Sequence, residues 1–162
     1  MRDRDQLNQS STIATNPEAQ GESQRLAWTI AQAASELQAE DIVLLQVTEV
    51  SYLADYFILA TGNSKTQVRA ISDAIQAKVA SQTQQHPVRM EGQAERNWIL
   101  QDYGDAIAHI LLPEEREFYN IEAFWGHAER IDFQSTKPAR DKSNEGISCF
   151  SLPSSHRTAT SQ

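Results

Sequence analysis

This chain of 162 residues has little cysteine and no long apolar run. Cys149 is the one cysteine, so neither an internal disulfide nor a metal site built from several cysteines can form. No window approaches the roughly 18 apolar residues of a membrane span. No apolar stretch of a signal peptide follows the charged N-terminus, whose early acidic residues also argue against a transit peptide. We therefore expect a protein of the reducing cytoplasm.

Basic residues are also in deficit. The formal net charge is -8, and residues 22–134 alone carry eight basic and seventeen acidic side chains. Nucleic-acid binding needs Lys and Arg to replace phosphate counterions, so this centre predicts no direct nucleic-acid readout. An acidic centre suits a basic protein partner, although solubility alone also accounts for it.

Apolar residues are sparse at both ends of the chain. Residues 1–22 and 134–162 are rich in Ser, Thr, Asn, Gln and Arg, which cannot pack a core. We expect these two segments to be disordered tails. They would flank one domain, residues 23–133, of an ordinary size for a single core.

The first part of this domain reads as one helix and two strands. Apolar residues at helical spacing from Leu26 to Leu37 predict a helix, and Ser23 is a plausible N-cap. The nearly unbroken apolar runs Ile42–Val47 and Tyr56–Ala60 have the length of strands covered on both faces.

A second helix follows the turn Thr61–Ser64. Ser64 and Gln67 stand in capping-box relation, and the apolar residues of the range 68–79 then share one helical face. Gln-rich residues 81–85 end this helix. The short run Pro87–Met90 predicts a strand near a sheet edge, because proline cannot donate to a ladder.

The last part predicts a hairpin and a helix. Strands Trp98–Gln101 and Ala106–Leu112 are joined by four residues that include Gly104 and two aspartates, which is a strong hairpin signal. Pro113 opens a helix whose apolar spacing extends through Phe118, Ile121, Phe124 and Trp125. Strands joined by helices together with a hairpin predict an α/β fold, with a mixed β-sheet and flanking helices.

The turn Thr61–Ser64 is the first candidate for chemistry, because a glycine turn before a helix can present backbone N–H groups to an anion. It is equally an ordinary way to enter a capped helix, and neither a phosphate-loop nor a dinucleotide motif is present. Nucleotidyltransferases place two metal-binding carboxylates after such a turn. Here Lys65, Thr66, Gln67 and Val68 follow instead, so we expect no metal site, no cofactor and no enzyme.

His109 and the aromatic residues are the other candidates. Strand alternation places His109 beside Ile107 and Leu111, where a histidine of the core is expected ahead of a base or ligand. Six aromatics crowd into residues 98–125, and most should be core. Tyr103 stands at the hairpin tip, where we expect exposure, and Trp98 opens the strand beside it; exposed aromatics of this kind serve as interface anchors.

Taken together, five segments of the chain resemble the ribosomal silencing factor family, also called Iojap-like. The resemblance runs in order from about Leu26 to Ala128. It is carried by Asp55–Ser64, Glu91–Gly92, Trp98–Asp105, His109 and Phe118–Trp125. Gln101 and Phe124 depart mildly from the family pattern, which has a more apolar residue and a leucine there.

The resemblance implies a nucleotidyltransferase-like fold without the catalytic carboxylates. It also implies a translational repressor that binds the fourteenth protein of the large ribosomal subunit and blocks joining of the small subunit when nutrients are scarce. Carried over by position, the partner-binding residues are Trp98, Leu100, Asp102, Tyr103, Gly104, Asp105, His109, Tyr119 and Glu122.

Two other functions stay open at this point. One is an assembly factor of the large subunit, and the other is an enzyme related to nucleotidyltransferases that uses the turn Thr61–Ser64. An exposed binding surface would also allow a homodimer when the partner is absent.

Overall fold

The computed structural model of the protein describes residues 17–133. Residues 1–16 and 134–162, which include most of the two expected tails and Cys149, lie outside the described residues. In residues 17–133, no helix combines the length and the apolar character that a bilayer span requires.

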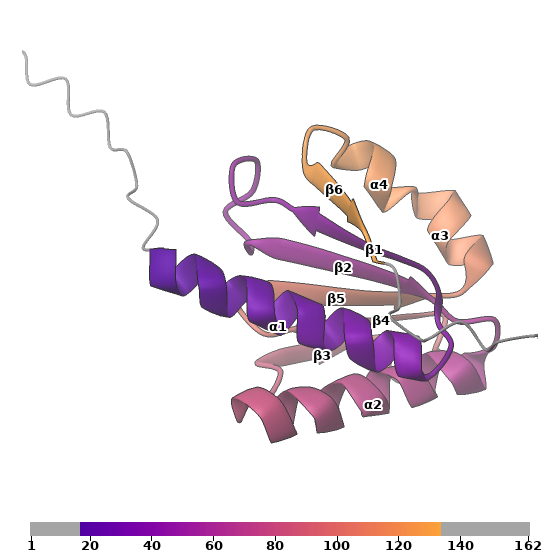
Figure 1. Ribbon diagram of the computed structural model, residues 1–162. Coiled ribbons are helices and arrows are strands. Elements are labelled where there is room, and N and C mark those ends of the chain that lie inside the picture. Colours follow the sequence, from indigo (N-terminus) through magenta and orange to yellow (C-terminus); the bar gives the residue numbers. More distant parts are fainter. Residues whose placement is uncertain (1–16, 134–162) are drawn as a thin grey trace, which may run out of the picture.

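The described chain is a six-stranded mixed sheet with helices on its two faces (Figure 1). The strands lie in the order β3-β4-β5-β2-β1-β6, and β2 runs parallel to β5 while the other neighbours run antiparallel. The elements are α1 (Pro17–Glu36), β1 (Glu40–Gln46), β2 (Tyr56–Thr61), α2 (Lys65–Thr83), β3 (Arg89–Glu91), β4 (Trp98–Asp102), β5 (Ala106–Leu111), α3 (Pro113–Tyr119), α4 (Ile121–Phe124) and β6 (Glu129–Asp132). The predicted mixed sheet, its hairpin and its edge strand β3 are confirmed.

Strand alternation gives the sheet two apolar faces. One face packs under α1 and α2, and its buried cluster includes Leu44, Ile58 and Ile110 with the apolar sides of both helices. The opposite face carries a smaller cluster, and α3 and α4 lie over it (Figure 1). That cluster consists of Val43, Leu45, Val47, Ala54, Phe57, Leu59 and Ile107. Strands β2 and β5 are buried along their whole length because both faces are covered there.

The turn before α2 is explained by packing. Ser64 caps the helix, since its Oγ accepts the Gln67 N–H at 3.1 Å, and Gln67 Oε1 accepts the Asn63 N–H at 2.8 Å. A Cβ on Gly62 would lie 2.9 Å from Cγ2 of Val68, so glycine allows the helix to approach the strand end this closely. The structure thus supplies a packing reason for this turn.

The first helix corrects one prediction. It begins at Pro17, so Ser23 lies inside the helix and is not its N-cap. The Ser23 hydroxyl instead donates to Oδ2 of Asp55 at 2.7 Å, which ties α1 to the start of β2. Residues 17–22, which we expected in the tail, are helical.

The last predicted helix is two helices. Asn120 takes a left-handed conformation with φ 43°, which ends α3 and starts α4. Phe118 and Phe124, which we took for its apolar face, are exposed. A further strand that we did not predict, β6, then pairs antiparallel with β1.

A candidate partner-binding surface on strand β4 and helix α3

The sheet face under α3 and α4 is left partly open at strand β4. Side chains alternate along this strand, so Trp98, Leu100 and Asp102 point to the open face and are half-buried, whereas Ile99 and Gln101 are buried under α2. In register, Trp98 lies opposite Leu111 of β5. Three of the predicted partner-binding residues therefore share one accessible strip.

Aromatic side chains of α3 extend this strip. The rings of Trp98 and Tyr119 lie 4.9 Å apart, and those of Tyr119 and Phe118 lie 5.0 Å apart. Tyr119 is 51% exposed and Phe118 is 80% exposed, although we had placed most of these aromatics in the core. We call Trp98, Leu100, Asp102, Phe118 and Tyr119 the Trp98 surface. Phe118 is the member that sequence reasoning missed.

His109 supports the Trp98 surface from below. Its ring is buried, packs edge-on to Phe57 at 5.4 Å, and accepts the Trp98 indole N–H through Nδ1 at 3.2 Å. Burial lowers the pKa of His109 to about 4, so the imidazole is neutral at pH 7. The predicted core histidine is confirmed, and its ring holds Trp98 in place without reaching the surface.

Tyr103 is buried, so our expectation that its side chain is exposed at the hairpin tip was wrong. It continues the alternation of Ile99 and Gln101 toward α2, and its hydroxyl donates to Gln101 Oε1 at 3.0 Å. The Gln101 amide in turn donates to the Ser72 carbonyl at 2.9 Å and to the Ser72 hydroxyl at 2.6 Å. Burial raises the pKa of Tyr103. This satisfied polar network explains why a glutamine fits a fully buried position.

Gly104 and Asp105 are the exposed tip of the hairpin. Gly104 has φ +88°, which suits glycine, and its N–H donates to Asp102 Oδ1 at 2.8 Å. Tyr103 N–H donates to the Ala106 carbonyl at 2.9 Å and closes the turn. The tip therefore lies at the far end of β4 from Trp98.

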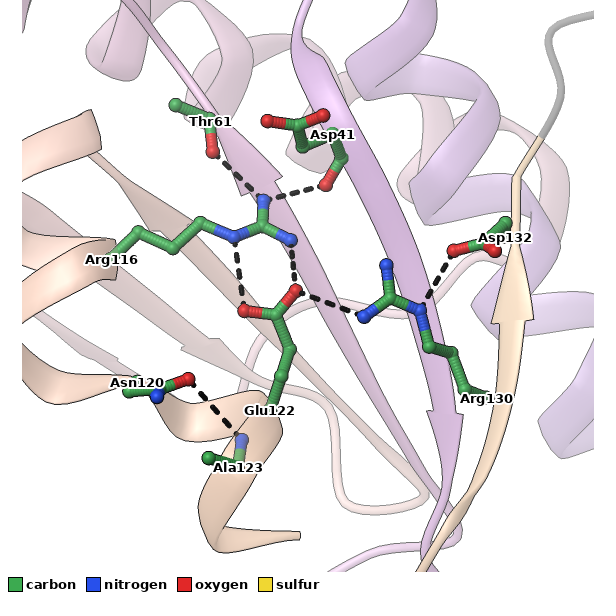
Figure 2. Close-up of polar contacts among 8 residues, drawn as sticks. All are labelled: Asp41, Thr61, Arg116, Asn120, Glu122, Ala123, Arg130 and Asp132. Atoms are coloured by element: carbon green, nitrogen blue, oxygen red, sulfur yellow. Dashed lines mark hydrogen bonds and ion pairs between the residues drawn. The ribbon is translucent and has the colours of Figure 1, made fainter. Parts of the chain in front are cut away.

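Glu122 belongs to an ion-pair network that sequence reasoning did not find (Figure 2). Both of its carboxylate oxygens accept from Arg116, at 2.6 and 3.2 Å. Arg116 also donates to the Asp41 carbonyl and, at 2.8 Å, to the Thr61 hydroxyl. A bidentate arginine that also caps strand ends ties α3 and α4 to β1 and β2.

This network is largely withdrawn from solvent. The Arg116 and Glu122 side chains are 11% and 20% exposed, and Arg130 lies 3.6 Å from Glu122 at its outer side. Glu122 therefore acts as a positioning residue that fixes the broken helix, and with it Tyr119, over the sheet. The expectation that Glu122 itself binds a partner remains a prediction.

Two shallow hollows adjoin the network, with volumes of about 550 and 340 Å³. Their charged side chains include Arg116 and Glu122, which already satisfy one another. Across residues 17–133, no group of three or more His, Cys, Asp or Glu side chains is placed to hold a metal ion.

Most of this chain is similar in sequence to known proteins. The sequence model of the family described as "Ribosomal silencing factor during starvation" matches residues 20–149. The ribosomal silencing factor of Bacillus subtilis is 39% identical over 102 residues, which are 63% of this chain and 86% of that protein. The mouse protein named "Mitochondrial assembly of ribosomal large subunit protein 1" is 30% identical over 89 residues, 54% of this chain and 39% of that protein. A crystal structure from Chromobacterium violaceum superposes with a TM-score of 0.61 at 31% identity, over 71% of this chain and 96% of that chain.

Proposed function

Because this chain belongs to the ribosomal silencing factor family, we propose that it is a translational repressor that binds the large ribosomal subunit through that subunit's fourteenth protein. Its bulk would then block joining of the small subunit when nutrients are scarce. We place this action in the cytoplasm, where the subunits meet.

The Trp98 surface is the observation that carries the proposal. Phe118 and Tyr119 are exposed, and the half-buried Trp98 is fixed by His109 below and by Tyr119 beside it. Aromatic anchors on a rigid frame lose little conformational entropy on binding and dominate the energy of many interfaces. This is a surface suited to a protein partner.

The charges around the surface favour a basic partner. Helix α3 presents Glu114, Glu115 and Glu117, while its one arginine, Arg116, turns inward to Glu122. Asp102 adds a carboxylate on the strand side. Many ribosomal proteins are basic, so opposite charges would speed association and set its orientation.

The proposed action needs affinity and volume, and no reaction. A protein held on the face of the large subunit that meets the small one prevents joining by occupying space. Repression would therefore follow binding stoichiometrically, with one protein per large subunit.

Sedimentation of the protein with isolated large subunits tests this proposal, followed by calorimetry with the purified fourteenth protein. Tyr119→Ala should weaken both interactions about thirtyfold, the loss expected of an interface anchor worth about 2 kcal/mol. Val88→Ala removes an exposed apolar side chain beside the edge strand β3 and serves as the matched control, with no expected effect. No sedimentation of the unaltered protein with large subunits would contradict the proposal.

A second function is favoured by one specific observation, the name of the mouse relative, which refers to assembly of the mitochondrial large subunit. An assembly factor would use the same contact on maturing subunits and leave mature ones free to join. Deletion of the gene would then cause precursor ribosomal RNA to accumulate, while added protein would leave joining of mature subunits unchanged.

A further inference from the structure

The connection between β1 and β2 carries a second exposed apolar group. In residues 47–55, Tyr52 is fully exposed at 103%, Leu53 is 68% exposed and Val50 is 41% exposed. Apolar side chains gathered this closely on a surface commonly mark an interaction site. We call these three side chains the Tyr52 group.

Backbone hydrogen bonds fold this connection into a defined turn. The N–H groups of Val50 and Ser51 both donate to the Val47 carbonyl, at 2.9 and 2.8 Å. The Leu53 N–H donates to Ser51 Oγ at 3.1 Å. At its end, Asp55 N–H donates to the Asp105 carbonyl at 2.9 Å, which joins the turn to the hairpin tip. The apolar group is thus presented on an ordered frame, which reduces the entropy cost of binding.

The Tyr52 group lies at the opposite end of the strands from Trp98, and at the same end as Asp102. Trp98 lies opposite Leu111, which pairs with Thr61 at the end of β2, whereas the turn precedes Tyr56 at its beginning. Five residue steps along β2 separate Tyr56 from Thr61, a distance of about 16 Å at the usual rise per residue. The family resemblance assigned no residue of the Tyr52 group to partner binding.

Carboxylates gather around the turn. Glu49 lies within it, Asp55 ends it, Asp105 is bonded to it, and Glu129 lies opposite Gln46 at the end of β1. Burial, followed by the negative charges of Asp55 and Glu129, raises the pKa of Tyr56 beside them. Apolar side chains ringed by negative charge complement a basic protein surface that offers an apolar recess.

We propose that the Tyr52 group is a second docking site, for a basic protein of the large ribosomal subunit other than the fourteenth. The inference rests on the proposed function, because that function supplies the subunit on which both contacts are made. A second copy of this chain would bring two acidic clusters together, and nucleic acid would add phosphate to them, so both are disfavoured. Two contacts about 16 Å apart would also fix the protein's orientation, which steric exclusion requires.

A photoreactive benzoyl-phenylalanine placed at position 52 or at position 119 tests the inference with isolated large subunits. The probe at position 119 should cross-link to the fourteenth protein, and the probe at position 52 to a different basic protein. A cross-link from 119 without one from 52 overturns the second site alone, as does a cross-link from 52 to RNA or to another copy of this chain. Loss of sedimentation and of both cross-links would instead overturn the proposed function.

The double substitution Tyr52→Ser with Leu53→Ser provides an independent measure. It should leave thermal stability unchanged, since both side chains are exposed, and should weaken binding to large subunits about tenfold. Val88→Ser, an exposed apolar position beside β3, should not weaken it. Equal binding by the double variant and the Val88 control would overturn the second site.

Discussion

Acidification should destabilise the protein through His109, beneath the Trp98 surface. Nδ1 of His109 accepts the Trp98 indole N–H and therefore carries no proton at neutral pH. The native pKa is about 4, whereas the unfolded chain has the usual value of about 6.5. Between these values the unfolded state binds a proton that the native state refuses, so stability falls as the pH falls. The contribution is fully present above about pH 6.5 and is lost progressively toward pH 4.

The size of this effect follows from the two pKa values. At pH 5 the unfolded histidine is almost fully protonated and the native one almost fully neutral, which amounts to about 2 kcal/mol of lost stability relative to high pH. His109→Phe removes the titration while keeping an aromatic ring against Phe57. The exposed histidines His86 and His127 and all carboxylates stay common to both proteins.

Urea unfolding followed by far-ultraviolet circular dichroism, at pH 7 and pH 5, measures the effect. The unaltered protein should lose about 2 kcal/mol more than His109→Phe between these two pH values. If both proteins lose the same free energy, His109 is not held neutral by burial, and its role in fixing Trp98 fails with it.

Two further predictions concern single positions that hold the frame of the surface. Arg116→Ala should lower the free energy of unfolding by about 3 kcal/mol, because it leaves the largely buried Glu122 carboxylate without its main partner. Arg69→Ala, which removes an exposed ion pair, should cost less than about 1 kcal/mol. Equal losses in urea unfolding would show that the Arg116–Glu122 pair does not hold α3 and α4 on the sheet. Gly92→Ala should destabilise the protein strongly, because a Cβ on Gly92 would lie 1.8 Å from the Trp98 carbonyl oxygen. Gly104→Ala should cost only about 1 kcal/mol, because a Cβ there would meet open space and only the positive φ is unfavourable. Similar melting temperatures of the two variants would contradict this prediction.

The buried elements were readable from sequence because each has a clear apolar period. Strands β1 and β2 contain the apolar runs Ile42–Leu45 and Tyr56–Ala60, and His109 is the one polar residue of β5. Helix α2 buries the apolar residues that its helical period selects. Strand β6 was missed because Ile131 is its one apolar residue, and pairing to β1 at the sheet edge makes it a strand. The break at Asn120 was hidden because apolar spacing continues across it.

The site was readable in part. The family pattern selected Trp98, Leu100, Asp102 and Tyr119, which the structure brings onto one surface. The alternation that begins at Ile99 predicts a buried Tyr103, but we missed this because we assigned Tyr103 to the turn. Arg116 stands among glutamates and reads as a solvated charge. Its pairing with Glu122, six residues away across a helix break, falls outside any helical spacing rule.

Subunit joining followed by light scattering tests the central claim most directly. The protein, incubated first with isolated large subunits and then mixed with small subunits, should suppress formation of whole ribosomes in proportion to the fraction of large subunits bound. Tyr119→Ala should suppress it only at correspondingly higher concentration. Whole ribosomes that form at the same rate and to the same extent with saturating protein would contradict the account.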